Sequence, residues 1–181
     1  IVNPAPKGQS LSKLLVILEG SWADANDWAA QQRKALEVVQ QSRNQGRPVA
    51  FLQLTAPQDD LVFSAASEVA PAIKAAEPNA WLPKESWQGQ FEPLGDFDTH
   101  WLASPLDWSG RTQLARELLR YGSVEVAMRL SSPLGLLPVQ TTAQGIEIAA
   151  VRTTAGQAQV VAVDILGLDP SGVERRFKLL I

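Results

Sequence analysis

An apolar run that ends abruptly in polar residues is the feature that most constrains the fold of this chain. Residues 14–18 read Leu-Leu-Val-Ile-Leu and are followed at once by Glu19, Gly20 and Ser21. A short run without polar interruption is typical of a strand covered on both faces, as in a parallel sheet. In open α/β sheets, ligand sites lie at the carboxyl ends of such strands, beside the start of a helix. The run therefore predicts an α/β fold with a candidate site around Glu19.

Strand-like and helix-like patterns alternate as far as residue 130. The predicted elements are strands at 11–18, 49–54, 100–103 and 124–128, and helices at about 28–46, 64–77 and 111–121. Asp24, Asn26 and Asp27 offer alternative N-caps for the first helix, and Pro71 is expected to disturb the middle of the second. Because strand, helix and strand at this spacing imply right-handed parallel crossovers, the pattern predicts a Rossmann-like, mostly parallel sheet flanked by helices.

Residues 78–99 and the stretch after residue 130 break this alternation. A structureless loop of this length is uncommon, so we expect a short element within 78–99, held down by its aromatic side chains Trp81, Trp87 and Phe91. The later strands, at 146–151, 159–164 and 174–179, are joined by turns at Gly156 and 169–172 without helices. The predicted organisation is a linker at 1–10, an α/β domain at 11–130 and a small antiparallel β appendage, or part of a β-sandwich, at 131–181.

Composition excludes several function classes. The net charge of −3 gives no electrostatic reason to expect nucleic acid or an anionic membrane surface as partner. The absence of cysteine excludes disulfides, thiolate metal sites and a cysteine nucleophile. No apolar run reaches the roughly 18 to 20 residues that cross a bilayer, and the start carries no signal-peptide pattern. Because Ile1 is not methionine, we expect an excised fragment whose anchor or signal lies outside it.

Short motifs in order along the chain carry a resemblance to a known family. They are residues 19–23 (Glu-Gly-Ser-Trp-Ala), 46–49 (Gly-Arg-Pro-Val), 101–107 (Trp-Leu-Ala-Ser-Pro-Leu-Asp) and 122–124 (Gly-Ser-Val). Together the motifs of residues 1–130 resemble a divergent von Willebrand factor A-like domain, of the type found in bacterial membrane proteins that begin with an aerotolerance-regulator-type module. In that family two membrane helices precede the domain and a domain of unknown function follows, and residues 1–4 are similar to the chain just after the second helix. The resemblance implies a membrane-anchored protein with this part on the periplasmic face.

The metal site of that superfold looks degenerate in this sequence. Metal-binding members carry Asp-x-Ser-x-Ser after the first strand, a threonine from another loop and an aspartate after a later strand, oxygens that suit Mg²⁺. The matching positions here are Glu19, Ser21 and Ala23, with Ser104 in place of the later aspartate and Thr55 in a suitable loop. Glu19 is one methylene too long and Ala23 has no side-chain oxygen. We therefore predict no metal and no other cofactor, and expect Glu19 and Ser21 to cap the following helix instead.

The residues favour a non-catalytic protein. A hydrolase would need Ser21 as nucleophile, His100 as base, and Asp98 or Asp107 as the orienting acid. The Gly-x-Ser-x-Gly elbow is absent, and His100 is the chain's one histidine. No phosphate-binding glycine loop appears either. A Ser-His hydrolase is kept as the weakest alternative.

The predicted function is protein binding at the carboxyl edge of the sheet. Exposed indoles are favoured at interfaces, and Trp22 and Trp108 should lie near one edge, although burial of both in the core is an equal alternative. The predicted partner-binding residues are Glu19, Ser21, Trp22, Asp24, Ser104, Asp107 and Trp108. We expect an extracytoplasmic assembly module that contacts an envelope or membrane protein. The alternative is a glycan or peptidoglycan binder that uses aromatic loops containing Trp81 and Trp87.

Overall fold

The computed structural model describes residues 12–56, 61–128, 134–137, 139–142, 145–152, 160 and 162–180. The chain divides into two compact units, Ile1–Ser131 and Ser132–Ile181, a division one residue away from the predicted boundary. The predicted linker at 1–10 lies outside the described residues.

The first unit contains a four-stranded sheet in which every neighbouring pair is parallel. Its strands are β1 (Lys13–Leu18), β2 (Val49–Gln53), β3 (Phe97–Ala103) and β4 (Val124–Met128), in the order β2-β1-β3-β4. The parallel α/β prediction is confirmed at this level. The chain passes from β1 to β2 on one side and then crosses to β3 on the other side of β1. The carboxyl ends of β1 and β3 therefore form the topological switch point, where open α/β sheets bind ligands.

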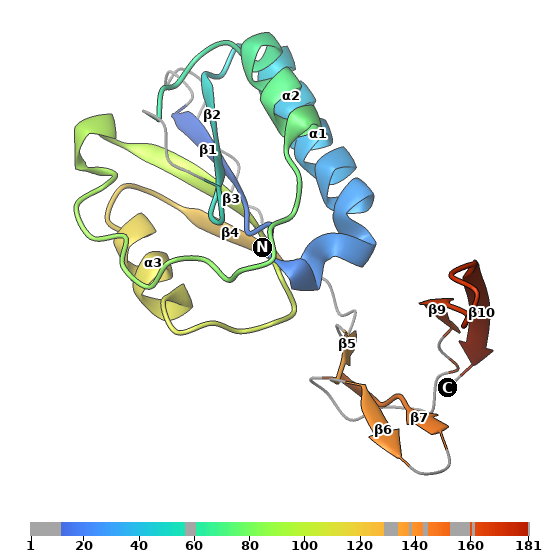
Figure 1. Ribbon diagram of the computed structural model, residues 1–181. Helices are drawn as coiled ribbons and strands as arrows, with labels where there is room; N and C mark the ends of the chain where they lie inside the picture. Colours follow the sequence, from blue (N-terminus) through green and yellow to red (C-terminus); the bar gives the residue numbers. More distant parts are fainter. Residues whose placement is uncertain are drawn as a thin grey trace. The chain divides into compact units, whose positions relative to one another are not determined.

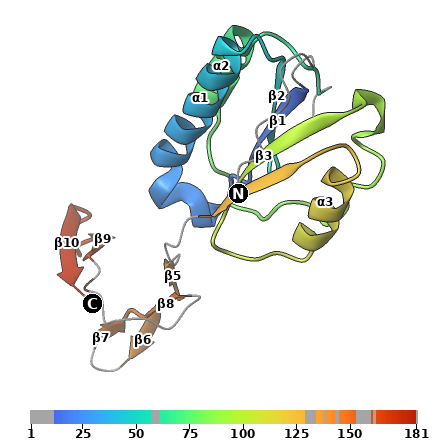
Figure 2. The same cartoon turned by 180° about the vertical axis from the view of Figure 1, so that it is seen from behind.

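Helices cover both faces of this sheet (Figures 1 and 2). The helices α1 (Trp28–Asn44) and α2 (Ala66–Ala75) lie on one face, and α3 (Arg111–Leu118) lies on the other. A 3-10 helix, η1 (Trp22–Asp27), leads into α1. Side chains alternate between two cores: Val16 and Leu18 pack towards α1 and α2, while Leu15 and Ile17 pack towards α3. This double coverage explains why the first strand is apolar without interruption.

Aromatic side chains hold the long loop before β3 against the sheet, as the sequence predicts. Trp87 and Phe91 are buried, and their rings lie nearly parallel with centroids 6.3 Å apart. Phe91 also meets Phe97 of β3 edge-on at 6.1 Å. The expected short element is a 3-10 helix, η2 (Glu92–Leu94). Trp81, in contrast, is 57% exposed.

Two element predictions need correction. The second helix runs through Pro71 without a break. Pro71 and Ser67 are both exposed, so water can reach the carbonyl of Ser67 that Pro71 leaves without a donor. The third helix ends at Leu118 instead of Tyr121, because the chain turns there and the Tyr121 ring stacks on Phe97 at 5.3 Å.

The strand pairs that the structure describes in the second unit are all antiparallel, as predicted. The pairs are β5 (Leu134–Leu136) with β8 (Ala150–Arg152), β6 (Gln140–Thr142) with β7 (Gly145–Glu147), and β9 (Ala162–Leu168) with β10 (Glu174–Leu180). The strand predicted at 146–151 is instead two short strands with different partners. The predicted turn at 169–172 is confirmed, since Gly172 donates its N–H to the Asp169 carbonyl at 2.8 Å. The turn predicted at Gly156 lies outside the described residues.

Candidate functional site

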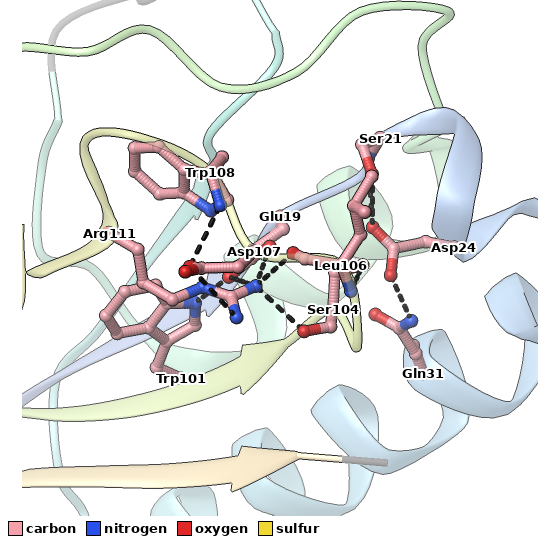
Figure 3. A network of polar contacts seen from close by, with 10 residues as sticks. All are labelled: Glu19, Ser21, Asp24, Gln31, Trp101, Ser104, Leu106, Asp107, Trp108 and Arg111. Carbon is pink, nitrogen blue, oxygen red and sulfur yellow. Dashed lines mark hydrogen bonds and ion pairs between the residues drawn. The ribbon is translucent and has the colours of Figure 1, made fainter. Parts of the chain in front are cut away.

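A network of buried polar side chains fills the switch point (Figure 3). Glu19 follows β1 and Ser104 follows β3, so the two residues stand at the carboxyl ends of adjacent strands. Both are buried, at 0% and 1% exposure. A carboxylate placed in such a position must find a partner, because an isolated buried charge is strongly unfavourable.

Arg111 is the partner of Glu19. Its Nη2 atom lies 3.0 and 2.9 Å from the two carboxylate oxygens of Glu19. The indole Nε1 of Trp101, on the neighbouring strand β3, donates to the same carboxylate at 3.1 Å. Glu19 is therefore held by a guanidinium and an indole.

The same guanidinium closes the loop that follows β3. Arg111 Nη2 also lies 2.8 Å from the Ser104 carbonyl and 2.7 Å from the Leu106 carbonyl, and its Nη1 atom is 3.7 Å from Asp107. Arg111 is the first residue of α3, where the helix dipole disfavours a positive charge. The favourable contacts with Glu19 and the two carbonyls offset this cost, which indicates that Arg111 is placed to bind the switch point.

Burial raises the pKa of Glu19 from its usual 4.5 to about 7. Loss of water is the largest cause, and the neighbouring charge of Asp24 acts in the same direction. Arg111 opposes the rise through its charge and its hydrogen bonds, and Trp108 opposes it more weakly. Perturbed carboxyl groups gather at functional sites but also in structural ion pairs, so the geometry must decide between the two.

Asp24 forms the second half of the network, and no cationic side chain among the described residues pairs with it. Its carboxylate accepts the backbone N–H of Ser21 at 2.9 Å, the Ser21 hydroxyl at 3.3 Å and the amide of Gln31 at 2.8 Å. Ser21 is the N-cap residue of η1, which confirms the expected capping role for Ser21. Glu19 plays no such part, because its oxygens face Arg111.

Gly20 allows the chain to turn between the two carboxylates. Its φ of +69° is the left-handed conformation that glycine adopts most easily. A Cβ atom at this position would lie 2.5 Å from Nε2 of Gln53, so a side chain here would require Gln53 to move. The Gly20 carbonyl accepts the Thr55 hydroxyl at 2.7 Å and the backbone N–H of Asn79 at 2.8 Å. The loop after β2 is thereby tied to the end of β1.

Most of the predicted partner-binding residues do not form a surface, which corrects the picture of a displayed strand end. Glu19, Ser21, Asp24, Ser104 and Trp108 are brought together but are at most 6% exposed. Their polar groups face one another because they follow strands that are buried on both faces. Only two of the seven residues lie outside: Trp22 is 41% exposed and the Asp107 side chain 86%. For these two, partner binding remains a prediction.

The residues of the hydrolase alternative are paired elsewhere. The Ser21 hydroxyl bonds Asp24, and the His100 ring nitrogen Nδ1 lies 3.1 Å from the Glu125 carboxylate. Asp98 lies at the opposite end of β3 and binds Arg47 and Ser123. None of these contacts joins a serine to the histidine.

The donor set at the switch point does not suit a divalent cation. The Glu19 carboxylate already binds a guanidinium, Ser21 bonds Asp24, and Ala23 has no side-chain oxygen. Thr55 is at the same edge, as the sequence suggests, but its hydroxyl is used by Gly20. Among the described residues there is no group of three or more His, Asp or Glu side chains arranged to hold a metal ion.

Sequence reasoning missed Arg111, the residue that organises the site. The available signal was an arginine at the start of a predicted helix, where an acid is the usual choice. That anomaly identifies a residue with a specific partner but does not name Glu19, which is 92 positions away in the chain.

No family model and no curated protein matches this chain. Within the described residues, no helix has the length and apolar character needed to span a membrane.

Proposed function

We propose that the first unit is a non-catalytic protein-interaction module with a permanently closed switch point. The observation that carries this proposal is the Glu19–Arg111 pair, in which the carboxylate is fully buried and both of its oxygens contact the guanidinium. A carboxylate engaged in this way is not free to bind a metal. The position where this fold class usually binds ligands then serves stability.

Exposed residues around this closed centre are the proposed contact surface. Trp22 lies two residues after Gly20, and the exposed indole of Trp81 donates to the Thr55 carbonyl at 2.8 Å. Because Thr55 and Asn79 both bond Gly20, the two tryptophans sit on loops tied to one point at the end of β1. Large, partly exposed aromatic side chains on a rigid base are the usual anchors of protein interfaces.

The resemblance to the von Willebrand factor A-like family supports the cellular setting of the proposal. In that setting the domain is extracytoplasmic, belongs to a membrane-anchored protein and contacts an envelope protein. The guanidinium of Arg111 would then stand where metal-binding members of the superfold hold a cation. Its contacts with a carboxylate and two carbonyls support this part of the proposal.

Burial of most tryptophans argues against the glycan-binding alternative. Four of the six tryptophans, Trp28, Trp87, Trp101 and Trp108, are buried and cannot stack on sugars. Trp22 and Trp81 remain the only exposed indoles of the chain, because all six tryptophans lie within the described residues.

Site-specific photocrosslinking tests the proposal. A photoreactive amino acid is placed at Trp22, at Trp81 or, as a matched control, at exposed Gln40 on α1. In cells that express the anchored full-length protein, we expect the same protein adduct from positions 22 and 81 and none from position 40. Adducts from all three positions, or from none, would contradict the proposed surface. Quenching of tryptophan fluorescence by soluble peptidoglycan fragments would favour the glycan alternative.

A further inference from the structure

The two edges of the four-stranded sheet differ in whether another segment pairs with them. At the β2 edge, Val49 and Ser64 exchange two backbone hydrogen bonds of 2.9 Å, so a neighbouring segment covers part of that strand. Within the described part of the chain, no segment pairs with the outer side of β4. Natural proteins usually protect such an edge with lysine, proline or a bulge. The sequence of β4, Val-Glu-Val-Ala-Met, contains neither lysine nor proline.

The unpaired backbone groups of β4 can be assigned from the register. The Thr99 N–H donates to the Ser123 carbonyl at 2.8 Å, and Thr99 lies opposite Val124. Because peptide groups alternate in direction along a parallel strand, those of Val124, Val126 and Met128 point away from β3. Val126 and Met128 also expose 47% and 52% of their surface, so this edge is apolar as well as open.

We infer that β4 pairs with β4 of a second copy of this chain, antiparallel, about a twofold axis at Val126. In this register Val126 lies opposite itself and Val124 lies opposite Met128. All three outward-facing peptide groups then gain a partner, and the two sheets join into one of eight strands. A twofold interface of this kind is self-complementary, as most homodimer interfaces are.

The charges near β4 favour this register and favour a second copy of the chain as the partner. Glu125, the only charged residue of β4, lies opposite Ala127, whereas an axis at Glu125 would bring two carboxylates together. On the α1 face, a groove of about 430 Å³ runs between α1 and Ala127, with Arg33 on its rim. Arg33 has no ion-pair partner among the described residues. Glu125 of the second copy, whose carboxylate lies 3.1 Å from His100 Nδ1 of its own copy, would enter beside this groove and bring a carboxylate near Arg33.

The expected dimer is weak. Five paired residues per copy bury far less than the roughly 1,600 Å² of a standard stable interface. Association should therefore be reversible and depend on protein concentration.

Single cysteines introduced into the cysteine-free chain test the register. In Val126→Cys, the two thiols flank the axis, with Cα atoms about 5.5 Å apart, which is within disulfide range. In the matched control, Val124→Cys, the two cysteines are about 13 Å apart along the strands, too far to bridge. Under mild oxidation we expect a disulfide dimer from Val126→Cys, and little from Val124→Cys unless Met128→Cys protein is mixed in. Equal crosslinking of both single variants, or none of either, would overturn the proposal.

Sedimentation of the full chain tests association without crosslinks. Val126→Pro removes a backbone donor that points away from β3, so the sheet keeps its internal hydrogen bonds. Val126→Thr retains the donor and the strand preference and is the control. We expect the unmodified chain and Val126→Thr to dimerise as concentration rises, and Val126→Pro to stay monomeric with an unchanged circular dichroism spectrum. An unmodified chain that remains monomeric at every concentration would overturn the inference, and if Val126→Pro fails to fold, the cysteine variants decide the matter.

Discussion

Glu19 should make the stability of the first unit depend on pH. Burial raises its pKa to about 7 in the folded protein, against 4.5 as its ordinary value. Between these values the folded protein holds a proton that the unfolded chain has released, so the free energy of unfolding falls as pH rises. The full loss from pH 4.5 to above pH 7 is about 3 kcal/mol, at 1.36 kcal/mol for each pKa unit.

Urea unfolding from pH 5 to 8 measures this dependence. All six tryptophans lie in the first unit, so their fluorescence reports its unfolding alone. Glu19→Gln keeps the size of the side chain and should remove most of the slope, whereas Glu37→Gln, at an exposed position on α1, should leave it unchanged. Equal slopes in the unmodified protein and Glu19→Gln would show that another group controls the titration.

Replacing Arg111 should lower the free energy of unfolding, and should lower it more at high pH. Arg111→Met leaves the Glu19 carboxylate buried without its counter-charge, a change that typically costs about 3 to 5 kcal/mol. At pH 5 Glu19 is mostly protonated, so the loss should be smaller than at pH 8. Arg116→Met removes an exposed arginine of the same helix and is the control. Equal destabilisation by the two variants would mean that the buried pair contributes little.

At the scale of elements, the turn after β1 depends on one glycine. Gly20→Ala must tolerate a positive φ and a contact of 2.5 Å with the Gln53 side chain. Gly46, at the end of α1, has a similar φ of +65°, but no atom lies within 4 Å of the place that an added Cβ would take, so Gly46→Ala bears the conformational cost alone. We expect Gly46→Ala to lower the free energy of unfolding by about 1 kcal/mol and Gly20→Ala to lower it clearly more, as measured by urea unfolding. Equal losses would show that Gln53 moves aside freely.

The sequence predicts elements well where one physical signal dominates. The apolar runs at 14–18 and 49–53 mark buried parallel strands, and aromatic residues mark the loop before β3 as part of the core. It predicts element ends less well, because these depend on contacts between distant residues. Tyr121 leaves its helix to stack on Phe97, and the stretch at 146–151 divides between two partners.

At the scale of the molecule, the sequence locates the candidate site but not its character. The positions of Glu19 and Ser104 follow from parallel strands that end at one edge, and the order β2-β1-β3-β4 places those two strands side by side. Whether the polar residues face solvent or one another depends on a long-range partner, Arg111, that no local pattern predicts. A buried ion pair and a ligand site can therefore arise from the same motif.

The central claim is that a side chain of this protein, Arg111, supplies the positive charge at the switch point. Thermal unfolding of the intact chain in chelator, in millimolar Mg²⁺ and in millimolar Ca²⁺ tests it most directly, because an ion that binds the folded state raises the melting temperature. We predict the same melting temperature in all three conditions. A rise of several degrees with either ion would contradict the claim, since it would mean that the oxygens around Glu19 still hold a metal.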